Sequence, residues 1–166
     1  MTPIVAKRSR KQPQAPRTAH RPTVASGAVA VRYVESSALV AALLERDPEA
    51  LKSLRAKTRQ ITSALTLAES ARALVRARVS GRVTTDQERE AVRGLRRFER
   101  RCYVVAITDE VLARVRRPFP VEPVRTLDAV HIATVESLGE PPQLVTIVTR
   151  DSRVRANANA LGYSVE

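Results

Sequence analysis

The sequence predicts an α/β fold, doubly wound, with a mainly parallel central sheet and helices on both faces. Two observations lead to it. Short apolar runs of strand length alternate with longer segments of helical periodicity along most of the chain. The run at 144–148 is predominantly apolar, as expected for a strand that is buried on both faces of a parallel sheet. A length of 166 residues suits one compact domain.

Apolar spacing and turn-forming residues define the elements of the first half of the chain. Asp47 and Pro48 end the first expected helix, and Gly81 follows the last one. The periodicity of that last helix directs Ala71, Leu74 and Val75 inward, together with Leu67. The elements expected here are strands at 31–34 and 60–63 and helices at 36–46, 49–57 and 65–79.

The second half begins with a helix that Thr84 or Thr85 caps, and Glu88 is placed to form a capping box with Thr85. A later helix is apolar on most sides, which predicts that it is buried. Gly162 closes the last helix. The elements expected here are helices at 85–101, 109–116, 126–138 and 152–161, strands at 103–107, 144–148 and 163–165, and a proline-rich loop at 119–123.

The charge is strongly basic and unevenly distributed. Lys and Arg number 29 against 17 Asp and Glu, a formal charge of +12. Residues 1–28 contain six of the basic residues, four prolines and no acid, which predicts a disordered basic arm; a start codon assigned too early explains the segment equally well. Residues 29–166 form the expected folded domain and carry the other half of the charge. Such a balance indicates a polyanionic partner.

Several protein classes are excluded. No apolar run approaches the roughly 18 residues of a membrane span. The single cysteine, Cys102, cannot form an intramolecular disulfide or a cysteine-based zinc site, so a reducing compartment, the cytoplasm, is expected. The five glycines form no phosphate-binding loop, which argues against kinases, GTPases and dinucleotide enzymes.

Four carboxylates are candidates for a metal site. Glu35 and Asp151 follow predicted strands, where ligands of open α/β sheets bind. Glu69 and Asp128 lie in helices whose apolar surroundings do not explain a charge. Converging carboxylates repel one another unless a cation neutralises them, and their oxygens favour Mg²⁺ or Mn²⁺. Each also has an ordinary alternative: a solvated strand end for Glu35, an ion pair with Arg72 for Glu69, and helix N-terminal positions for Asp128 and Asp151.

Four blocks of sequence resemble, in order, the PIN-domain ribonucleases of the VapC toxin type. They are Tyr-Val-Glu-Ser-Ser-Ala-Leu-Val at 33–40, Thr-Ser-Ala-Leu-Thr-Leu-Ala-Glu at 62–69, Arg-Thr-Leu-Asp-Ala-Val-His-Ile-Ala at 125–133, and Val-Thr-Arg-Asp at 148–151 followed by Ala-Leu-Gly at 160–162. The resemblance covers roughly residues 31–166, and four ordered blocks are far more specific than one short motif.

The resemblance implies a Mg²⁺-dependent endoribonuclease, the toxin of a toxin–antitoxin pair, that hydrolyses RNA through a metal-activated water. Its implied partners are tRNA or another structured RNA, a cognate antitoxin and a second copy of the chain. Mn²⁺ is an alternative cation. The implied catalytic residues are Glu35, Glu69, Asp128 and Asp151, which also hold the metal, and Ser37.

The family has Asp where this chain has Glu35, which leaves open a noncatalytic or attenuated RNA-binding protein. His131 lies three residues after Asp128, and we interpret it as a packed or hydrogen-bonded side chain, because hard cations prefer oxygen ligands.

Arg72 and Arg76 share a helix face with Glu69 and either bind phosphates or balance the carboxylates. The residues expected to bind the substrate are Arg72, Arg76, Arg150 and Arg153.

Overall fold

A five-stranded parallel sheet forms the centre of the protein, in the strand order β3-β2-β1-β4-β5. The computed structural model describes residues 30–166, so the predicted basic arm at 1–28 lies outside the described residues. The predicted fold class is confirmed. The strands are β1 (Val31–Val34), β2 (Arg59–Ser63), β3 (Tyr103–Val105), β4 (Val145–Val148) and β5 (Ser164–Val165).

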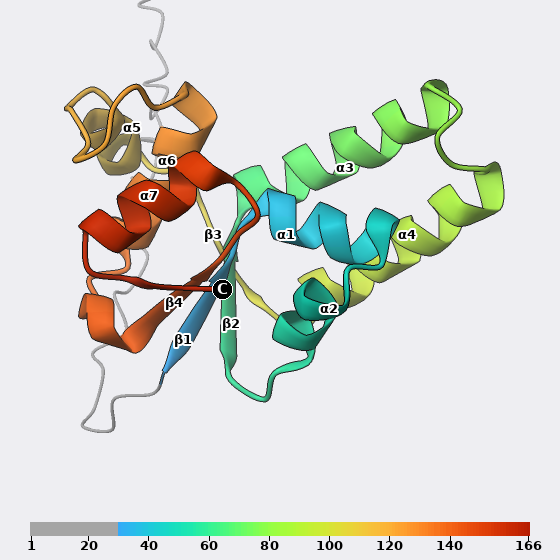
Figure 1. Ribbon diagram of the computed structural model, residues 1–166, viewed down its shortest axis with the longest axis horizontal. Coiled ribbons are helices and arrows are strands. Elements are labelled where there is room, and N and C mark those ends of the chain that lie inside the picture. The colour runs from blue at the N-terminus through green and yellow to red at the C-terminus, as the bar shows by residue number, and fades with distance from the viewer. Residues whose placement is uncertain (1–29) are drawn as a thin grey trace, which may run out of the picture.

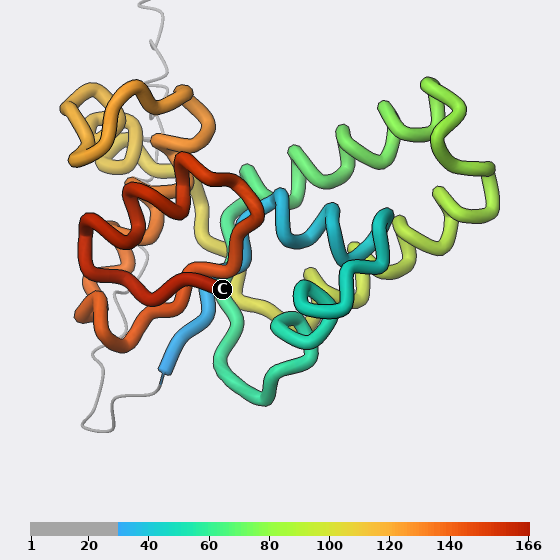
Figure 2. The backbone as a smooth tube through the Cα atoms, viewed as in Figure 1, coloured from blue at the N-terminus to red at the C-terminus, as the bar shows by residue number. Residues whose placement is uncertain are grey.

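Helices cover both faces of this sheet (Figure 1). One group, α5 to α7, lies on one side, and the other group, α1 to α4, lies on the opposite side, where α3 and α4 form a hairpin that extends away from the sheet (Figure 2). The helical segments are α1 (Ser36–Val40), the π-helical turn η1 (Ala41–Glu45), α2 (Pro48–Arg55), α3 (Ala64–Val79), α4 (Thr85–Glu99), α5 (Asp109–Val115), α6 (Thr126–Ser137), the 3-10 turn η2 (Pro142–Leu144) and α7 (Ser152–Ala160).

Alternation along β1 divides the core between the two faces. Val31 and Tyr33 pack in one apolar cluster with α6 and α7, and Val34 packs in a second cluster with α1, α3 and α4. The central strand is therefore buried on both sides, as parallel strands require. Helix α6 is buried over Ala129–Val135, which agrees with its apolar sequence.

Three local features differ from the expectations. The helix expected at 36–46 changes to a π-helical turn at Ala41 and ends at Arg46, whose φ of 54° is left-handed. The buried face of α3 is formed by Thr66, Ser70, Leu74 and Ala77, whereas Ala71 and Val75 are exposed. The capping box of α4 joins Thr84 to Gln87 rather than Thr85 to Glu88. No helix among residues 30–166 is both long and apolar enough to cross a membrane.

Candidate metal centre

Glu35 is the first acid of the site and lies at the junction of β1 and α1. Its backbone N–H continues the sheet by donating to the Val148 carbonyl at 3.0 Å. Its extended backbone then makes it the N-cap residue of α1. The residue is only 4% exposed, so its carboxylate must find partners within the protein.

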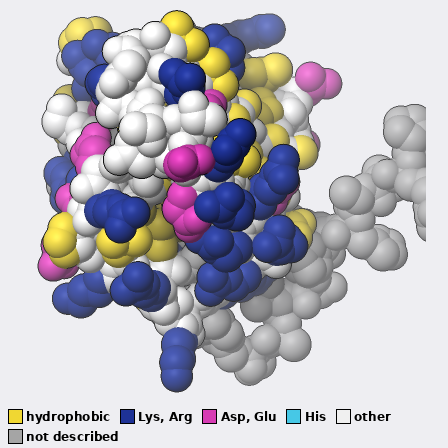
Figure 3. Space-filling view, turned by 90° about the vertical axis from the view of Figure 1, so that its right-hand side faces the viewer, with side chains coloured by type: hydrophobic (Ala, Val, Ile, Leu, Met, Phe, Trp, Pro, Cys, Tyr) yellow, Lys and Arg dark blue, Asp and Glu magenta, His cyan; other side chains and the backbone are white. Residues whose placement is uncertain are grey.

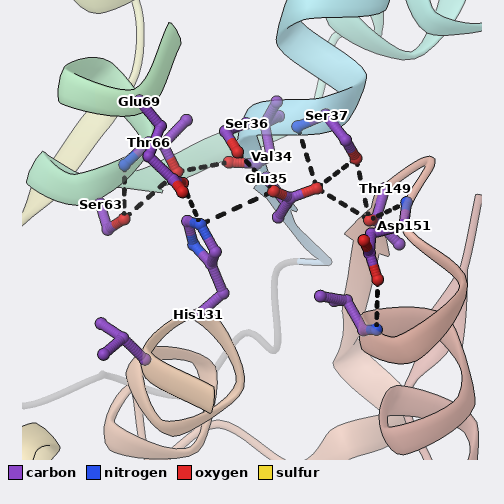
Figure 4. Close-up of polar contacts among 12 residues, drawn as sticks. Val34, Glu35, Ser36, Ser37, Ser63, Thr66, Glu69, His131, Thr149 and Asp151 are labelled. Carbon is purple, nitrogen blue, oxygen red and sulfur yellow. Dashed lines mark hydrogen bonds and ion pairs between the residues drawn. The ribbon is translucent and has the colours of Figure 1, made fainter. Parts of the chain in front are cut away.

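The Glu35 carboxylate accepts hydrogen bonds from three neighbouring residues (Figure 4). Ser36 Oγ donates to Oε1 at 2.6 Å. Oε2 accepts from the Ser37 backbone N–H at 3.0 Å, from the Ser37 hydroxyl and from Thr149 Oγ1 at 2.8 Å. These donors fix the carboxylate at the carboxyl ends of β1 and β4, and they leave Oε1 turned towards His131 at 3.6 Å from Nε2.

His131 connects the Glu35 side of the site to Glu69 on α3. Its Nε2 lies 2.7 Å from Glu69 Oε2, and its Nδ1 lies 3.0 Å from the Tyr33 hydroxyl. Half-burial of Glu69 opposes ionisation, but the bond to His131 and the nearby charge of Arg76 outweigh it, so the pKa of Glu69 lies below its usual range. Glu69 is therefore ionised at neutral pH.

Asp128 occupies the first turn of α6, one turn before His131. Its Oδ2 is buried and has no hydrogen-bond partner among the described residues. Burial, followed by the charges of Asp151 and Glu35, raises the pKa of Asp128 above its ordinary value. A cation would stabilise the ionised form of Asp128 against these neighbouring charges and would give its orphaned oxygen a partner.

Asp151 follows β4 and is the N-cap residue of α7. Its Oδ1 accepts from the backbone N–H groups of Arg153 at 2.8 Å and Val154 at 3.2 Å. Its own N–H donates to Thr149 Oγ1 at 3.0 Å, which ties it to the Glu35 network. Asp151 therefore caps α7, as the alternative interpretation from the sequence expected. Only Oδ1 takes part in the cap, and Oδ2 does not.

The structure divides the four predicted acids into two groups. Glu35 and Glu69, with His131, offer ligand atoms that all lie within 4.8 Å of one another. Asp128 and Asp151 lie outside that set, although the charges of Asp151 and Glu35 both act on Asp128. The carboxylate oxygens of Glu35 and Glu69 suit a hard divalent cation such as Mg²⁺ or Mn²⁺, so the acids present fit the implied metal.

Comparison with known proteins decides the family. The model of the PIN domain family matches residues 32–160. The chain belongs to the PIN domain family. The resemblance predicted from its four sequence blocks is confirmed.

The relatives of this PIN domain include named ribonucleases. It is 33% identical to Ribonuclease VapC35 of Mycobacterium tuberculosis over 137 residues, which cover 80% of this chain and 93% of the relative. Among solved structures, PAE2754 from Pyrobaculum aerophilum has a TM-score of 0.58 and 26% identity, over 83% of this chain and 84% of that one. VapBC2 from Rickettsia felis, whose structure was solved bound to a promoter DNA fragment, has a TM-score of 0.57 over 82% of this chain and 97% of that one. Its identity is 12%, so this similarity supports the fold alone.

Two of the four predicted substrate-binding arginines line a cleft beside the acids of the PIN domain. Arg72 and Arg76 border a cavity of about 460 Å³ together with Glu69, Ser36 and Ser37. The face on the side of the α3–α4 hairpin carries more Lys and Arg than Asp and Glu side chains (Figure 3). Arg72 and Arg76 therefore make this cleft suited to a polyanion.

The other two arginines are placed differently. Arg150 Nη2 lies 3.0 Å from Asp47 Oδ1, and Nη1 donates to the Thr149 carbonyl, so its guanidinium supports the loop after β4. Arg153 is exposed at the start of α7, close enough for its charge to lower the pKa of Asp128 against the larger effect of burial. Substrate binding by all four stays a prediction.

Sequence reasoning found Ser37 but missed two other hydroxyl residues that hold Glu35, Ser36 and Thr149. Thr149 is fully buried between Glu35 and Asp151, and Ser36 binds Glu35 Oε1. The sequence did offer one signal for Thr149, because it is a polar residue between the apolar run at 144–148 and Asp151. His131 was expected to be packed or hydrogen-bonded, which agrees with its two bonds.

Proposed function

We propose that this PIN domain is a divalent-metal-dependent endoribonuclease, the toxin of a toxin–antitoxin pair. The observation that carries the proposal is Asp128: its buried Oδ2 lacks a partner, and burial and the charges of Asp151 and Glu35 raise its pKa. This is the electrostatic signature of a cation site built from carboxylates. The ribonuclease name of VapC35 supports RNA as the substrate.

The residues have distinct roles in this proposal. Glu35, Glu69, Asp128 and Asp151 would hold the cation, Mg²⁺ or alternatively Mn²⁺, which supplies Lewis-acid stabilisation of charge on the phosphoryl oxygens. Ser36, Ser37 and Thr149 keep the Glu35 carboxylate in place before any ligand arrives. Asp128 Oδ2, which has no hydrogen-bond partner among the described residues, is available to the cation.

The substrate contacts follow from charge. Arg72 and Arg76 border the cleft at Glu69 and are placed to bind phosphates that flank the scissile bond. Ser37 lines the same cleft and donates to Glu35 while its Oγ accepts the Arg150 N–H at 2.7 Å, so it is oriented from two sides. The proposed partners are tRNA or another structured RNA, a cognate antitoxin and a second copy of the chain.

Asp128→Asn tests the proposal. It keeps the side-chain volume and removes the charge, so we expect RNA cleavage to fall by about 100-fold or more, the scale of several kcal/mol of transition-state stabilisation. EDTA should abolish wild-type cleavage, and Mg²⁺ or Mn²⁺ should restore it. Asp109→Asn, an exposed acid in the first turn of α5, is the matched control and should cleave normally.

Cleavage by Asp128→Asn at the wild-type rate would overturn the mechanism. RNA binding by the wild-type protein without any metal-dependent cleavage would instead point to the noncatalytic alternative. The structure does not favour that alternative, because the longer side chain of Glu35 still brings its carboxylate within 3.6 Å of His131 Nε2 in the cluster.

A further inference from the structure

We propose that Tyr33 and His131 form a positioning pair that pre-orients Glu69, and its spacing from Glu35, for the divalent cation. The inference rests on the proposed function and adds two residues that do not themselves bind the cation. It is carried by a continuous line of contacts from the core to the cluster: Tyr33 hydroxyl to His131 Nδ1 at 3.0 Å, and His131 Nε2 to Glu69 Oε2 at 2.7 Å.

Both members of the pair are held by the core. Tyr33 and His131 are each 1% exposed, and their rings meet edge to face with centroids 6.2 Å apart. Tyr33 lies in the middle of β1, hydrogen-bonded between β2 and β4, and His131 lies in the buried part of α6. Neither ring can turn without disturbing the packing between the sheet and α6.

The direction of the hydrogen bonds follows from the chemistry of the partners. A carboxylate oxygen of Glu69 lies 2.7 Å from His131 Nε2 and accepts, so Nε2 is the donor of this bond. The Tyr33 hydroxyl lies 3.0 Å from Nδ1 and is placed to donate to it. Both contacts suit the same imidazole tautomer, the one whose Nε2–H points to Glu69.

Glu69 needs such support more than the other acids. Glu35 and Asp151 are fixed by backbone N–H groups at helix N-termini. Glu69 lies within α3, has no such cap, and its side chain is 24% exposed at the cleft. A long, partly exposed side chain samples several rotamers unless a contact selects one. His131 makes that contact.

Tyr33 and His131 each lie close in sequence to one of the acids. Tyr33 lies on β1, two residues before Glu35, and His131 lies on α6, one helical turn after Asp128. Any shift of α6 against β1 therefore moves Asp128 and the Glu69 contact together. The pair fixes the distance between acids that come from three separate elements.

Mn²⁺ binding to the complete protein, measured by electron paramagnetic resonance without RNA, tests the pair. Tyr33→Phe keeps the ring and removes the hydroxyl, and we expect Mn²⁺ affinity to fall about 10- to 100-fold, the range seen when supporting residues of metal ligands are removed. His131→Gln, whose amide can still reach Glu69, should retain more affinity than His131→Leu. Tyr163→Phe removes a hydroxyl from the same apolar cluster and should bind Mn²⁺ normally.

A second measurement separates positioning from general stability. In the metal-free protein, ¹⁵N shifts should show His131 protonated at Nε2, and Tyr33→Phe should shift the Nδ1 resonance, because Nδ1 loses its hydrogen bond, while the fold, checked by circular dichroism, persists. Unchanged Mn²⁺ affinity in Tyr33→Phe would overturn the pair. A ¹⁵N hyperfine coupling between His131 and bound Mn²⁺ would also overturn it, because it would make the imidazole a ligand. Wild-type protein that binds no Mn²⁺ would overturn the metal centre itself, and the pair with it.

Discussion

At the scale of single residues, the extra methylene of Glu35 is absorbed by the turn that follows it. The side chain bends back onto the first turn of α1, where Ser36 and Ser37 bind its two oxygens, and Thr149, which follows β4, also donates to Oε2. A shorter carboxylate at this position would cap the helix equally well, since Asp is among the preferred N-cap residues.

Glu35→Asp is therefore expected to retain RNA hydrolysis at or above the wild-type rate. The shorter side chain keeps the carboxylate and restores the residue typical of the family, and Mg²⁺ coordination tolerates little displacement of its ligands. Initial cleavage rates at saturating Mg²⁺ measure the effect. Loss of cleavage in Glu35→Asp, with normal cleavage by a control such as Asp109→Asn, would show that the longer side chain is required.

Asp128→Asn should stabilise the metal-free protein. Because burial and neighbouring charges raise the pKa of Asp128 above 3.8, the folded state holds this proton more tightly than the unfolded chain does. Stability is thus lost as the pH rises through the folded-state pKa, and the loss persists at neutral pH. We expect a melting temperature about 1–3 °C higher than wild type in EDTA at pH 7.

The gain from Asp128→Asn should vanish well below pH 3.8, the ordinary pKa of the group, because the wild-type carboxyl is then protonated in both the folded and the unfolded state. Mg²⁺ or Mn²⁺ should reverse the order at pH 7 by stabilising only the wild type. A variant that is less stable than wild type in EDTA at every pH would contradict this account of Asp128.

The positions of the acids were predictable, but the contacts that hold them were not. Glu35 and Asp151 follow apolar runs, and the rule that ligands lie beyond the carboxyl ends of strands places both correctly. Thr149 belongs to the network because β4 pairs with β1, 114 residues away from Glu35, and no local pattern carries that information. The 2.7 Å contact of His131 with Glu69 likewise depends on how α6 meets α3.

At the scale of helices and strands, Asp151 combines a cap with an acid, and two substitutions separate these roles. Asp151→Ser keeps an oxygen that can cap α7 but removes the charge, so the melting temperature should stay close to wild type while RNA cleavage is lost. Asp151→Ala should lose cleavage and also about 1 kcal/mol of stability. Urea unfolding and cleavage rates, measured on both variants, check this.

Equal cleavage by Asp151→Ser and wild type would reduce Asp151 to a capping residue. Ser152→Ala, at the exposed first position of the same helix, is the control for nonspecific effects on α7.

Helix periodicity predicted the ends of α3 well, but it predicted less well which face of the helix is buried. The helix spans Ala64–Val79, close to the expected 65–79, but its buried face includes Thr66 and Ser70 instead of Ala71 and Val75. Thr66 is buried because its hydroxyl bonds to the Ser63 side chain and the Val34 carbonyl, partners that the sequence does not reveal. This rotation places Glu69 and Arg72 at the cleft.

At the scale of the whole molecule, the charge of +12 is shared between residues 1–28 and the PIN domain. We propose that residues 1–28 add affinity for RNA without selecting the site of cleavage. Deleting residues 2–28 removes six positive charges, so the slope of log K against log salt should become shallower by at most about 4. Filter binding across a salt series measures it.

The cleaved bond should stay the same after that deletion, because the acids and Arg72 and Arg76 all lie within residues 30–166. A new cleavage site in the shortened protein would show that residues 1–28 take part in selecting the RNA. An unchanged salt dependence would show that they do not touch it.

The strand order has a consequence for when the site forms during synthesis. β1 is made first but lies in the centre of the sheet, and one of its neighbours, β4, is made more than a hundred residues later. Until β4 pairs with β1, Glu35 lacks Thr149, and Asp151 has no place beside it. A partly synthesised chain on the ribosome can therefore fold its α3–α4 hairpin from local contacts, but it cannot assemble the four acids next to the RNA that surrounds it.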